Sequence, residues 1–193
     1  MPSIHRAIWR KFRVKSGDTL PYQGWAAGRG LLYELLGELG YTKGAEIGVE
    51  RGINAKDMFD KIPGLHLTCV DPWKQFHKRT DEIAEELYQE TKLRLAGCNV
   101  TYMRMPSMEA VKSIPDGSLQ FVYIDGLHDF DNVMLDMIYW VPKVMANGIV
   151  AGHDYQKQYQ NGVAEAVRAY TFSHNVFPWY ITRDREPSFF WVK

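Results

Sequence analysis

The sequence lacks an excess of charge of either sign. Its 23 lysine and arginine residues equal its 23 aspartate and glutamate residues, so the formal net charge at pH 7 is zero. Domains that bind nucleic acid usually carry a basic surplus that attracts the phosphates. The composition therefore argues against a nucleic-acid partner.

Long apolar runs and cysteines are also scarce. No apolar stretch approaches the ~20 residues that a membrane-spanning helix needs, and no signal-peptide pattern stands at the start of the sequence. The two cysteines, Cys69 and Cys98, lie in or beside apolar runs, which is typical of reduced core residues. We expect a cytoplasmic protein without a membrane partner.

What is present is a regular alternation of strand-like and helix-like segments. The 193 residues suit one domain, 1–193, in which residues 28–193 form the core and residues 1–27 a cap or arm. Apolar periodicity and glycine or proline boundaries predict strands at 44–49, 66–71, 99–105, 119–125, 147–155, 174–182 and 188–193. They predict helices at 28–40, 53–62, 80–96, after Pro106, at 129–141 and at 160–172.

This order predicts a doubly wound, Rossmann-like α/β fold. Hydrophobic strands that alternate with helices form a parallel sheet with helices on both faces. The last two strands are joined by the short polar turn 183–188, which leaves no room for a crossover helix. We therefore expect a seven-stranded, mostly parallel sheet with an antiparallel C-terminal hairpin, and ligands at the carboxyl ends of its strands.

The N-terminal arm has apolar residues at helical spacing between basic ones. Ile4, Ile8, Trp9 and Phe12 would share one face of a helix. Such a helix could touch phosphate or a membrane surface. The alternative, which we favour, is a cap helix that lies on the domain or on a second subunit, so that the arm would support a homo-oligomer.

A glycine-containing turn follows the first strand of the core. Gly48 and Gly52 stand where the chain passes from strand to helix, a place where a backbone can approach a ligand. Their G-x-x-x-G spacing is not the dinucleotide fingerprint G-x-G-x-x-G. A purely structural turn would explain the same residues.

Asp71 ends the second core strand, about 20 residues beyond these glycines. At such a position an acidic side chain can accept hydrogen bonds from both ribose hydroxyls of a nucleoside. Without a ligand, the same residue before Pro72 would cap a helix. The glycine-containing turn and the acidic residue at the strand end together favour a ligand that contains a nucleoside.

Acidic and imidazole side chains follow two adjacent strands. Asp125 and His128 come after the strand 119–125, and His153 and Asp154 end the strand 147–155. In a parallel sheet these residues meet at one edge, where two carboxylates and an imidazole would suit Mg²⁺ or Mn²⁺. Alternatively, Asp129 or Asp131 merely caps the next helix and His153 makes a core hydrogen bond.

The runs that carry these residues resemble a known family. EIGVERG (46–52), VDPW (70–73), RMPSMEA (104–110) and FVYIDGLHDFDNVMLDMIYWVPKVMANGIVAGHDY (121–155) are similar to class I S-adenosylmethionine-dependent methyltransferases. The family in question contains the macrocin, mycinamicin and novobiocin sugar O-methyltransferases. The resemblance covers about 40–190, is most specific over 119–155, and implies a single methyltransferase domain.

The resemblance also implies a role for each matching residue. The methionine part of S-adenosylmethionine would be surrounded by Glu46, Gly48, Gly52 and Asn54. Asp71 would hold the ribose with Trp73 beside it, Ser107 would lie near the adenine, and Asp125 would border the cofactor. Asp125 and Asp154 match Mg²⁺ ligands, and His128 matches the base that removes the acceptor proton. The chain departs from the best-known members at His153, where they have an acidic residue; His153 is our third candidate ligand.

The resulting hypothesis is methyl transfer to a hydroxyl of a small molecule such as a sugar or a phenol. Specificity would come from the arm and from residues 73–82 and 155–162. A NAD-dependent oxidoreductase and a non-catalytic S-adenosylmethionine-binding protein are the alternatives. A nucleic-acid amino-methyltransferase fits less well, because its N/D-P-P-Y/F loop belongs after the fourth strand, where this chain has Ile124-Asp125-Gly126.

Overall fold

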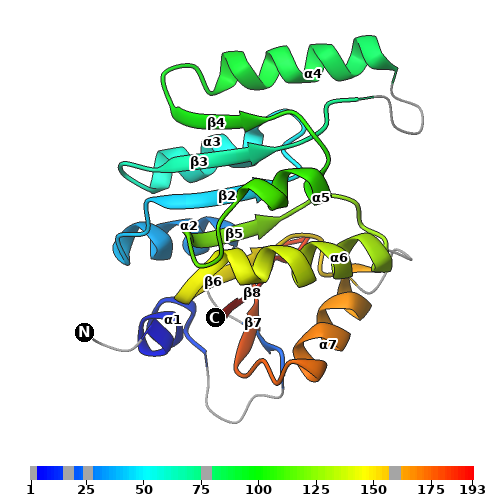
Figure 1. Cartoon of the computed structure of the whole chain (residues 1–193). Coiled ribbons are helices and arrows are strands. Elements are labelled where there is room, and N and C mark those ends of the chain that lie inside the picture. The colour runs from blue at the N-terminus through cyan, green and yellow to red at the C-terminus, as the bar shows by residue number, and fades with distance from the viewer. Residues whose placement is uncertain (1–3, 15–19, 24–27, 75–79, 157–161) are drawn as a thin grey trace.

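One eight-stranded sheet organises the chain. The computed structural model describes residues 4–14, 20–23, 28–74, 80–156 and 162–193 (Figure 1). The strands are β1 (Tyr22–Gln23), β2 (Lys43–Ile47), β3 (His66–Val70), β4 (Asn99–Met103), β5 (Leu119–Ile124), β6 (Val144–Gly152), β7 (Trp179–Ile181) and β8 (Phe189–Val192). Their order across the sheet is β1-β7-β8-β6-β5-β2-β3-β4.

The predicted parallel sheet and C-terminal hairpin are both confirmed. Every neighbouring pair runs parallel except those that include β8, which is antiparallel to both β6 and β7. The predicted strand 174–182 is shorter than expected, because residues 174–178 form the turn that ends the preceding helix and only Trp179–Ile181 join the sheet. The strand 147–155 is shifted toward the N-terminus, because Val144 already pairs with Leu119 and the chain leaves the sheet after Gly152.

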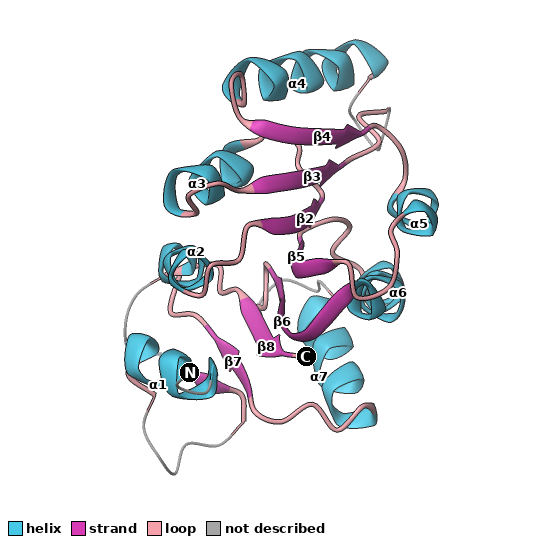
Figure 2. Cartoon of the chain, turned by 60° about the vertical axis from the view of Figure 1, so that its left-hand side comes forward, coloured by secondary structure: helices cyan, strands magenta, loops and turns pink. Residues whose placement is uncertain are grey.

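Helices cover both faces of this sheet, as predicted. They are α1 (Ile4–Phe12), α2 (Arg29–Glu38), α3 (Ile53–Lys61), α4 (Asp81–Arg94), α5 (Ser107–Ala110), α6 (Phe130–Trp140) and α7 (Val163–Ser173), with 3₁₀ turns at Val111–Ser113 and Val141–Lys143. Figure 2 shows α1, α2 and α3 on one side and α5, α6 and α7 on the other. Each side has its own buried apolar cluster. No helix among the described residues has the length and apolarity needed to cross a membrane.

The sheet has one strand more than the sequence predicts, and this strand comes from the N-terminal arm. Tyr22 and Gln23 pair parallel with Tyr180 and Ile181 of β7. Two residues carry too little periodicity to be recognised as a strand, and β7 lies more than 150 residues further along the chain. The arm therefore completes the edge of the sheet and does not lie wholly outside it.

The helix of the arm is a cap that packs on its own domain. Ile8 and Phe12 are 0% and 1% exposed, and the Phe12 ring lies 4.9 Å from that of Phe190 in β8. The indole N–H of Trp9 donates to the hydroxyl of Tyr180. Because the apolar face of α1 is used within the chain, a homo-oligomer through this arm, which stays a prediction, would rely on its polar face.

Replacement of Phe12 tests whether α1 belongs to the core. Phe12→Ala removes a buried ring and should lower the free energy of unfolding by about 3–5 kcal/mol. Arg10→Ala, on the exposed face of the same helix, should change it by less than about 0.5 kcal/mol. Urea denaturation measures both. Equal, small effects would mean that α1 is only loosely attached.

Candidate functional site

Four parallel strands end at the same level and bring the predicted residues together. Ile47 of β2 pairs with both Val70 of β3 and Ile124 of β5, and Ile124 pairs with Gly152 of β6. The ladder continues one residue further. The N–H of Gly48 donates to Val70 (2.9 Å), that of Asp125 to Ile47 (2.7 Å) and that of His153 to Ile124 (3.0 Å). The side chains that follow these strands therefore emerge side by side.

Gly48 is required by the protein itself at this edge. Its φ is +84°, and a Cβ on this residue would lie 2.0 Å from the carbonyl oxygen of Asp125. No other residue could keep the β2 turn so close to the loop that begins at Asp125. Gly52, with φ +69°, begins α3. Close packing thus accounts for Gly48, and ligand contact at these glycines stays a prediction.

Asp71 holds the turn after β2 in place. Its Oδ2 accepts the backbone N–H groups of Val49 (3.0 Å) and Glu50 (2.9 Å), and its Oδ1 accepts that of Trp73 (2.8 Å). The Trp73 indole is buried and donates to the carbonyl of Glu50. A carboxylate oxygen can accept more than one hydrogen bond, so the predicted contact with ribose is compatible with this network.

A buried polar chain lies beside the turn. Glu46 is fully buried, and its Oε1 accepts from Nδ2 of Asn54 (2.7 Å). Asn54 in turn accepts from the hydroxyl of Tyr33 (2.5 Å). In the part of the chain that the structure describes, nothing hydrogen bonds with Oε2 of Glu46. Burial raises the pKa of Glu46 to about 8. A buried acid with one oxygen unpaired has an unused hydrogen-bonding position, which a group outside the protein could occupy.

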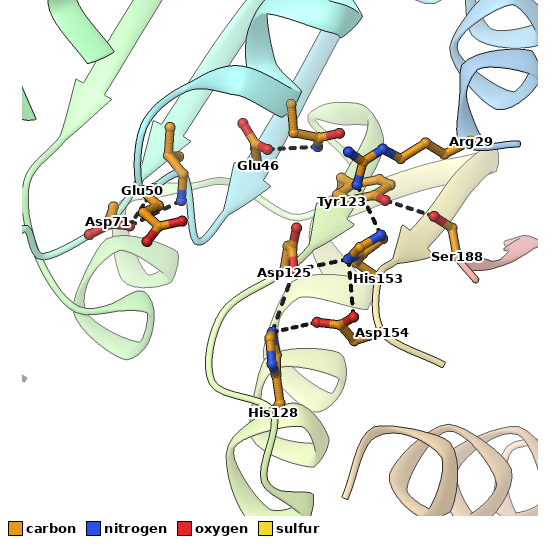
Figure 3. A network of polar contacts seen from close by, with 12 residues as sticks. Arg29, Glu46, Glu50, Asp71, Tyr123, Asp125, His128, His153, Asp154 and Ser188 are labelled. Carbon is orange, nitrogen blue, oxygen red and sulfur yellow. Dashed lines mark hydrogen bonds and ion pairs between the residues drawn. The ribbon is translucent and has the colours of Figure 1, made fainter. Parts of the chain in front are cut away.

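Two carboxylates and two imidazoles meet beyond β5 and β6 (Figure 3). Nε2 of His128 lies 3.5 Å from Oδ1 of Asp125 and 3.2 Å from Oδ2 of Asp154. Nδ1 of His153 lies 3.7 Å from Oδ1 of Asp125 and 3.4 Å from Oδ1 of Asp154. All four side chains, hereafter the acid–histidine cluster, keep some exposure, and His128 keeps the most. A ligand can therefore reach them.

The charges of the cluster support one another. The carboxylate of Asp125 raises the pKa of His128 against the opposing effect of burial. The neighbouring His153 lowers the pKa of Asp154, which therefore stays ionised at neutral pH. Asp154 has φ +55°, in the left-handed region that few non-glycine residues adopt. Backbone strain of this kind is frequent at functional sites.

The donor set of the cluster suits a divalent metal. The ligand atoms of Asp125, His128 and Asp154 all lie within 4.8 Å of one another, and so do those of His153, Asp154 and Glu186. Carboxylate oxygens with one imidazole are compatible with Mg²⁺ or Mn²⁺. The sequence predicts His153 as the third ligand beside Asp125 and Asp154, whereas the structure groups His128 with these two carboxylates and His153 with Asp154 and Glu186. The metal and its ligands stay predictions.

Sequence reasoning missed Arg29, which reaches the cluster from α2. Its Nη1 donates to Nε2 of His153 at 2.9 Å (Figure 3). A guanidinium can only donate, so Nε2 accepts and Nδ1, which faces Asp154, carries a proton. In this arrangement His153 is a hydrogen-bond donor to Asp154. No sequence signal links residues 124 positions apart.

The remaining predicted residues divide between the site and the parts of the chain that are not described. Ser107 begins α5, where its hydroxyl contacts Asp136 and Trp140 of α6. Tyr155, in one of the segments expected to select the acceptor, is buried and accepts from Nε of Arg168. Residues 75–79 and 157–161 of those segments lie outside the described residues.

Comparison with known proteins gives a family match over this region. A family model described as "Methyltransferase domain" matches residues 45–155, more than half of the chain. The chain is also 30% identical over 92 residues to the uncharacterized protein y4gI of Sinorhizobium fredii. That match covers 45% of this chain and only 10% of the relative.

Solved structures share the fold over most of both chains. An O-methyltransferase from Bacillus cereus in complex with SAH has a TM-score of 0.64 at 12% identity, covering 100% of this chain and 91% of that one. TomG from Streptomyces achromogenes, in complex with SAM, gives 0.62 at 12%, covering 100% and 90%. The O-methyltransferase NovP gives 0.63 at 17%, covering 86% and 79%. These similarities establish the architecture.

The buried acid makes a prediction about stability. The folded state holds the Glu46 proton up to a pH of about 8, whereas an unfolded chain loses it near pH 4.5. Folding therefore binds a proton in this window, and Glu46 makes stability fall as pH rises, by up to about 1.4 kcal/mol per pH unit. Glu46→Gln should remove this contribution and be the more stable protein at pH 8.

Urea denaturation at pH 5 and pH 8 measures the effect. Glu109→Gln, at an exposed position of α5, is the control and should follow the wild type at both values. If Glu46→Gln and the wild type lost stability in parallel between pH 5 and pH 8, Glu46 would not hold a proton in the folded state.

Proposed function

The chain belongs to the family of methyltransferase domains and is an S-adenosylmethionine-dependent methyltransferase, and on this premise we propose that it methylates a hydroxyl oxygen of a small molecule. Membership of the family decides against the NAD-dependent oxidoreductase that the sequence leaves open. The observation that carries the proposal is the acid–histidine cluster, in which an accessible imidazole lies within 3.5 Å of two carboxylates.

The donor site is assigned to the turn after β2. Glu46, Gly48, Gly52 and Asn54 would hold the methionine part, and Asp71, Trp73 and Ser107 the ribose and adenine. The unpaired Oε2 of Glu46 supports this assignment, because an ammonium group would satisfy it. When bound, the cofactor supplies an electrophilic methyl group on a sulfonium sulfur.

The acceptor site is assigned to the acid–histidine cluster. A neutral hydroxyl is a poor nucleophile, so the protein must take up its proton during transfer. Nε2 of His128 faces the carboxylates of Asp125 and Asp154 and, when protonated, donates to them. Nδ1 then carries the lone pair that accepts the acceptor proton. The two carboxylates stabilise the imidazolium that results, which is the physical reason that the pKa of His128 is raised.

A divalent metal is part of the proposal. Asp125 and Asp154 would hold Mg²⁺ or Mn²⁺, with His153 as the third ligand once the metal displaces its Nδ1 proton. A metal there would lower the pKa of an acceptor hydroxyl. His128 cannot use Nε2 both as a metal ligand and as the N–H donor to the carboxylates. A role of His128 as the base and a role as a metal ligand are therefore separable by experiment.

The acceptor class is a sugar or a phenol. The balance of 23 basic and 23 acidic residues supports a small molecule over a nucleic acid. The family resemblance over 119–155, which includes the whole acid–histidine cluster, favours O-methylation. A cytoplasmic location remains a prediction.

Removal of the imidazole tests the base. His128→Ala should lower kcat by about a hundredfold or more, while the Kd for S-adenosylhomocysteine, measured by calorimetry, stays within about twofold of the wild type. His174→Ala, just beyond the far end of α7, is the matched control and should retain turnover. Loss of S-adenosylhomocysteine binding in His128→Ala would instead make this residue a support of the cofactor site.

Removal of metal tests whether methyl transfer requires a divalent ion. Treatment with EDTA should abolish most turnover, and Mg²⁺ or Mn²⁺ should restore it, because the ion would activate the acceptor. Mn²⁺ binding, followed by electron paramagnetic resonance, should weaken about tenfold or more in Asp154→Asn and stay unchanged in His128→Ala and in the surface variant Asp116→Asn. Full turnover in EDTA would leave His128 and the carboxylates as a metal-free site, and loss of Mn²⁺ binding in His128→Ala would make His128 a ligand.

A further inference from the structure

A buried acid outside the acid–histidine cluster controls a hydroxyl of the donor site. Asp136 lies on the inner face of α6 and is 5% exposed. Its Oδ1 lies 2.5 Å from the hydroxyl oxygen of Ser107, at the start of α5. The same oxygen lies 2.7 Å from the indole nitrogen of Trp140, one turn further along α6. Nothing in the mechanism above uses Asp136 or Trp140.

These two partners fix the direction of every hydrogen bond that Ser107 makes. An indole N–H can only donate, and an ionised carboxylate can only accept. The hydroxyl proton of Ser107 is therefore committed to Asp136, and one of its two lone pairs is committed to Trp140. One lone pair remains. Ser107 can accept a further hydrogen bond but has no proton left to donate.

The trio lies at the cofactor edge of the sheet. A Cβ placed on Gly126, the residue after Asp125, would be 3.4 Å from Oδ2 of Asp136 and 3.9 Å from Cγ2 of Ile47, the last residue of β2. Ser107 itself follows β4 by only four residues and is partly exposed. Figure 2 shows α5 next to α6 on this side of the sheet. Ser107 therefore lies at the end of the strands to which the proposed function assigns the adenine.

We propose that Ser107, locked as an acceptor by Asp136 and Trp140, selects a donor cofactor whose purine carries an amino group at position 6. The inference rests on the proposed function, which puts the adenine beside Ser107. Adenine presents an N–H donor at that position, which the free lone pair of Ser107 accepts. A 6-oxo purine presents an acceptor, and two facing lone pairs repel each other and leave both groups unsatisfied.

Asp136 is therefore a positioning residue that acts through Ser107. A serine hydroxyl without fixed partners rotates and serves either a donor or an acceptor equally well. The acid removes that freedom. Burial raises the pKa of Asp136 to about 6. At pH 8, the pH chosen for the test, Asp136 is therefore ionised and can only accept hydrogen bonds.

The test compares two ligands that differ in the purine. Calorimetry at pH 8 gives the Kd of S-adenosylhomocysteine and of S-inosylhomocysteine, its 6-oxo analogue. The wild type should bind the adenosyl compound at least about tenfold more tightly. Equal affinities would overturn the inference and leave the proposed function intact. No binding of either compound would instead overturn the proposed function, and this inference with it.

Three variants distinguish loss of the hydrogen bond between Ser107 and Asp136 from general damage to the fold. Asp136→Ala frees the Ser107 proton, so S-inosylhomocysteine should bind more tightly than it does to the wild type, and the preference should fall several-fold. A merely structural defect would weaken both ligands together. Trp140→Phe keeps the hydrogen bond that the Ser107 hydroxyl donates to Asp136, so it should keep the preference for S-adenosylhomocysteine.

Ser107→Ala decides the matter if Asp136→Ala does not fold. It removes the acceptor, so S-adenosylhomocysteine should bind less tightly and the preference should again fall. A preference that stays at the wild-type value in Ser107→Ala, or in a folded Asp136→Ala, would overturn the inference.

Discussion

The site depends on the level at which the parallel strands end. In-register pairing of Ile47, Val70, Ile124 and Gly152 means that one further backbone hydrogen bond beyond each strand delivers the next residues to a common edge. The carbonyl of Asp125 is then so close to Gly48 that no side chain fits between them. A slip of one residue in β5 would turn its side chains to the opposite face of the sheet and would separate the acids that the chemistry needs.

Periodicity and spacing were sufficient for most of the architecture. The strands that hold the site are mostly apolar runs bounded by glycine, proline or acidic residues, and such runs are recognisable without any tertiary information. The grouping of Asp125, His128, His153 and Asp154 also followed from the sequence, because parallel strands that are adjacent place their carboxyl ends together. The antiparallel position of β8 followed from the length of one turn.

What could not be predicted depends on contacts between distant parts of the chain. Arg29 meets His153 across 124 positions, and Trp9 meets Tyr180 across 171. Tyr22 and Gln23 become a strand only because the edge of β7 is available to them. Asp136 has the spacing of an ordinary helix residue, and its significance follows only from burial and from the proximity of Ser107. Local sequence patterns do not predict such pairs, because each partner fits the helix or strand in which it lies without reference to the other.

The place of β8 in the sheet has a consequence for how the protein is made. In the strand order of the described residues, β8 alone joins β7 to β6, yet it follows both of them in the sequence. Until then, β6 exposes an unpaired edge, and β7 with its attached β1 has no partner in the rest of the sheet. The nascent chain carries this open edge from the synthesis of β6 until that of β8, a period in which unpaired strands are prone to aggregate. The sheet can therefore close only after β8 has been synthesised, and until then the edge of β6 needs protection from other chains.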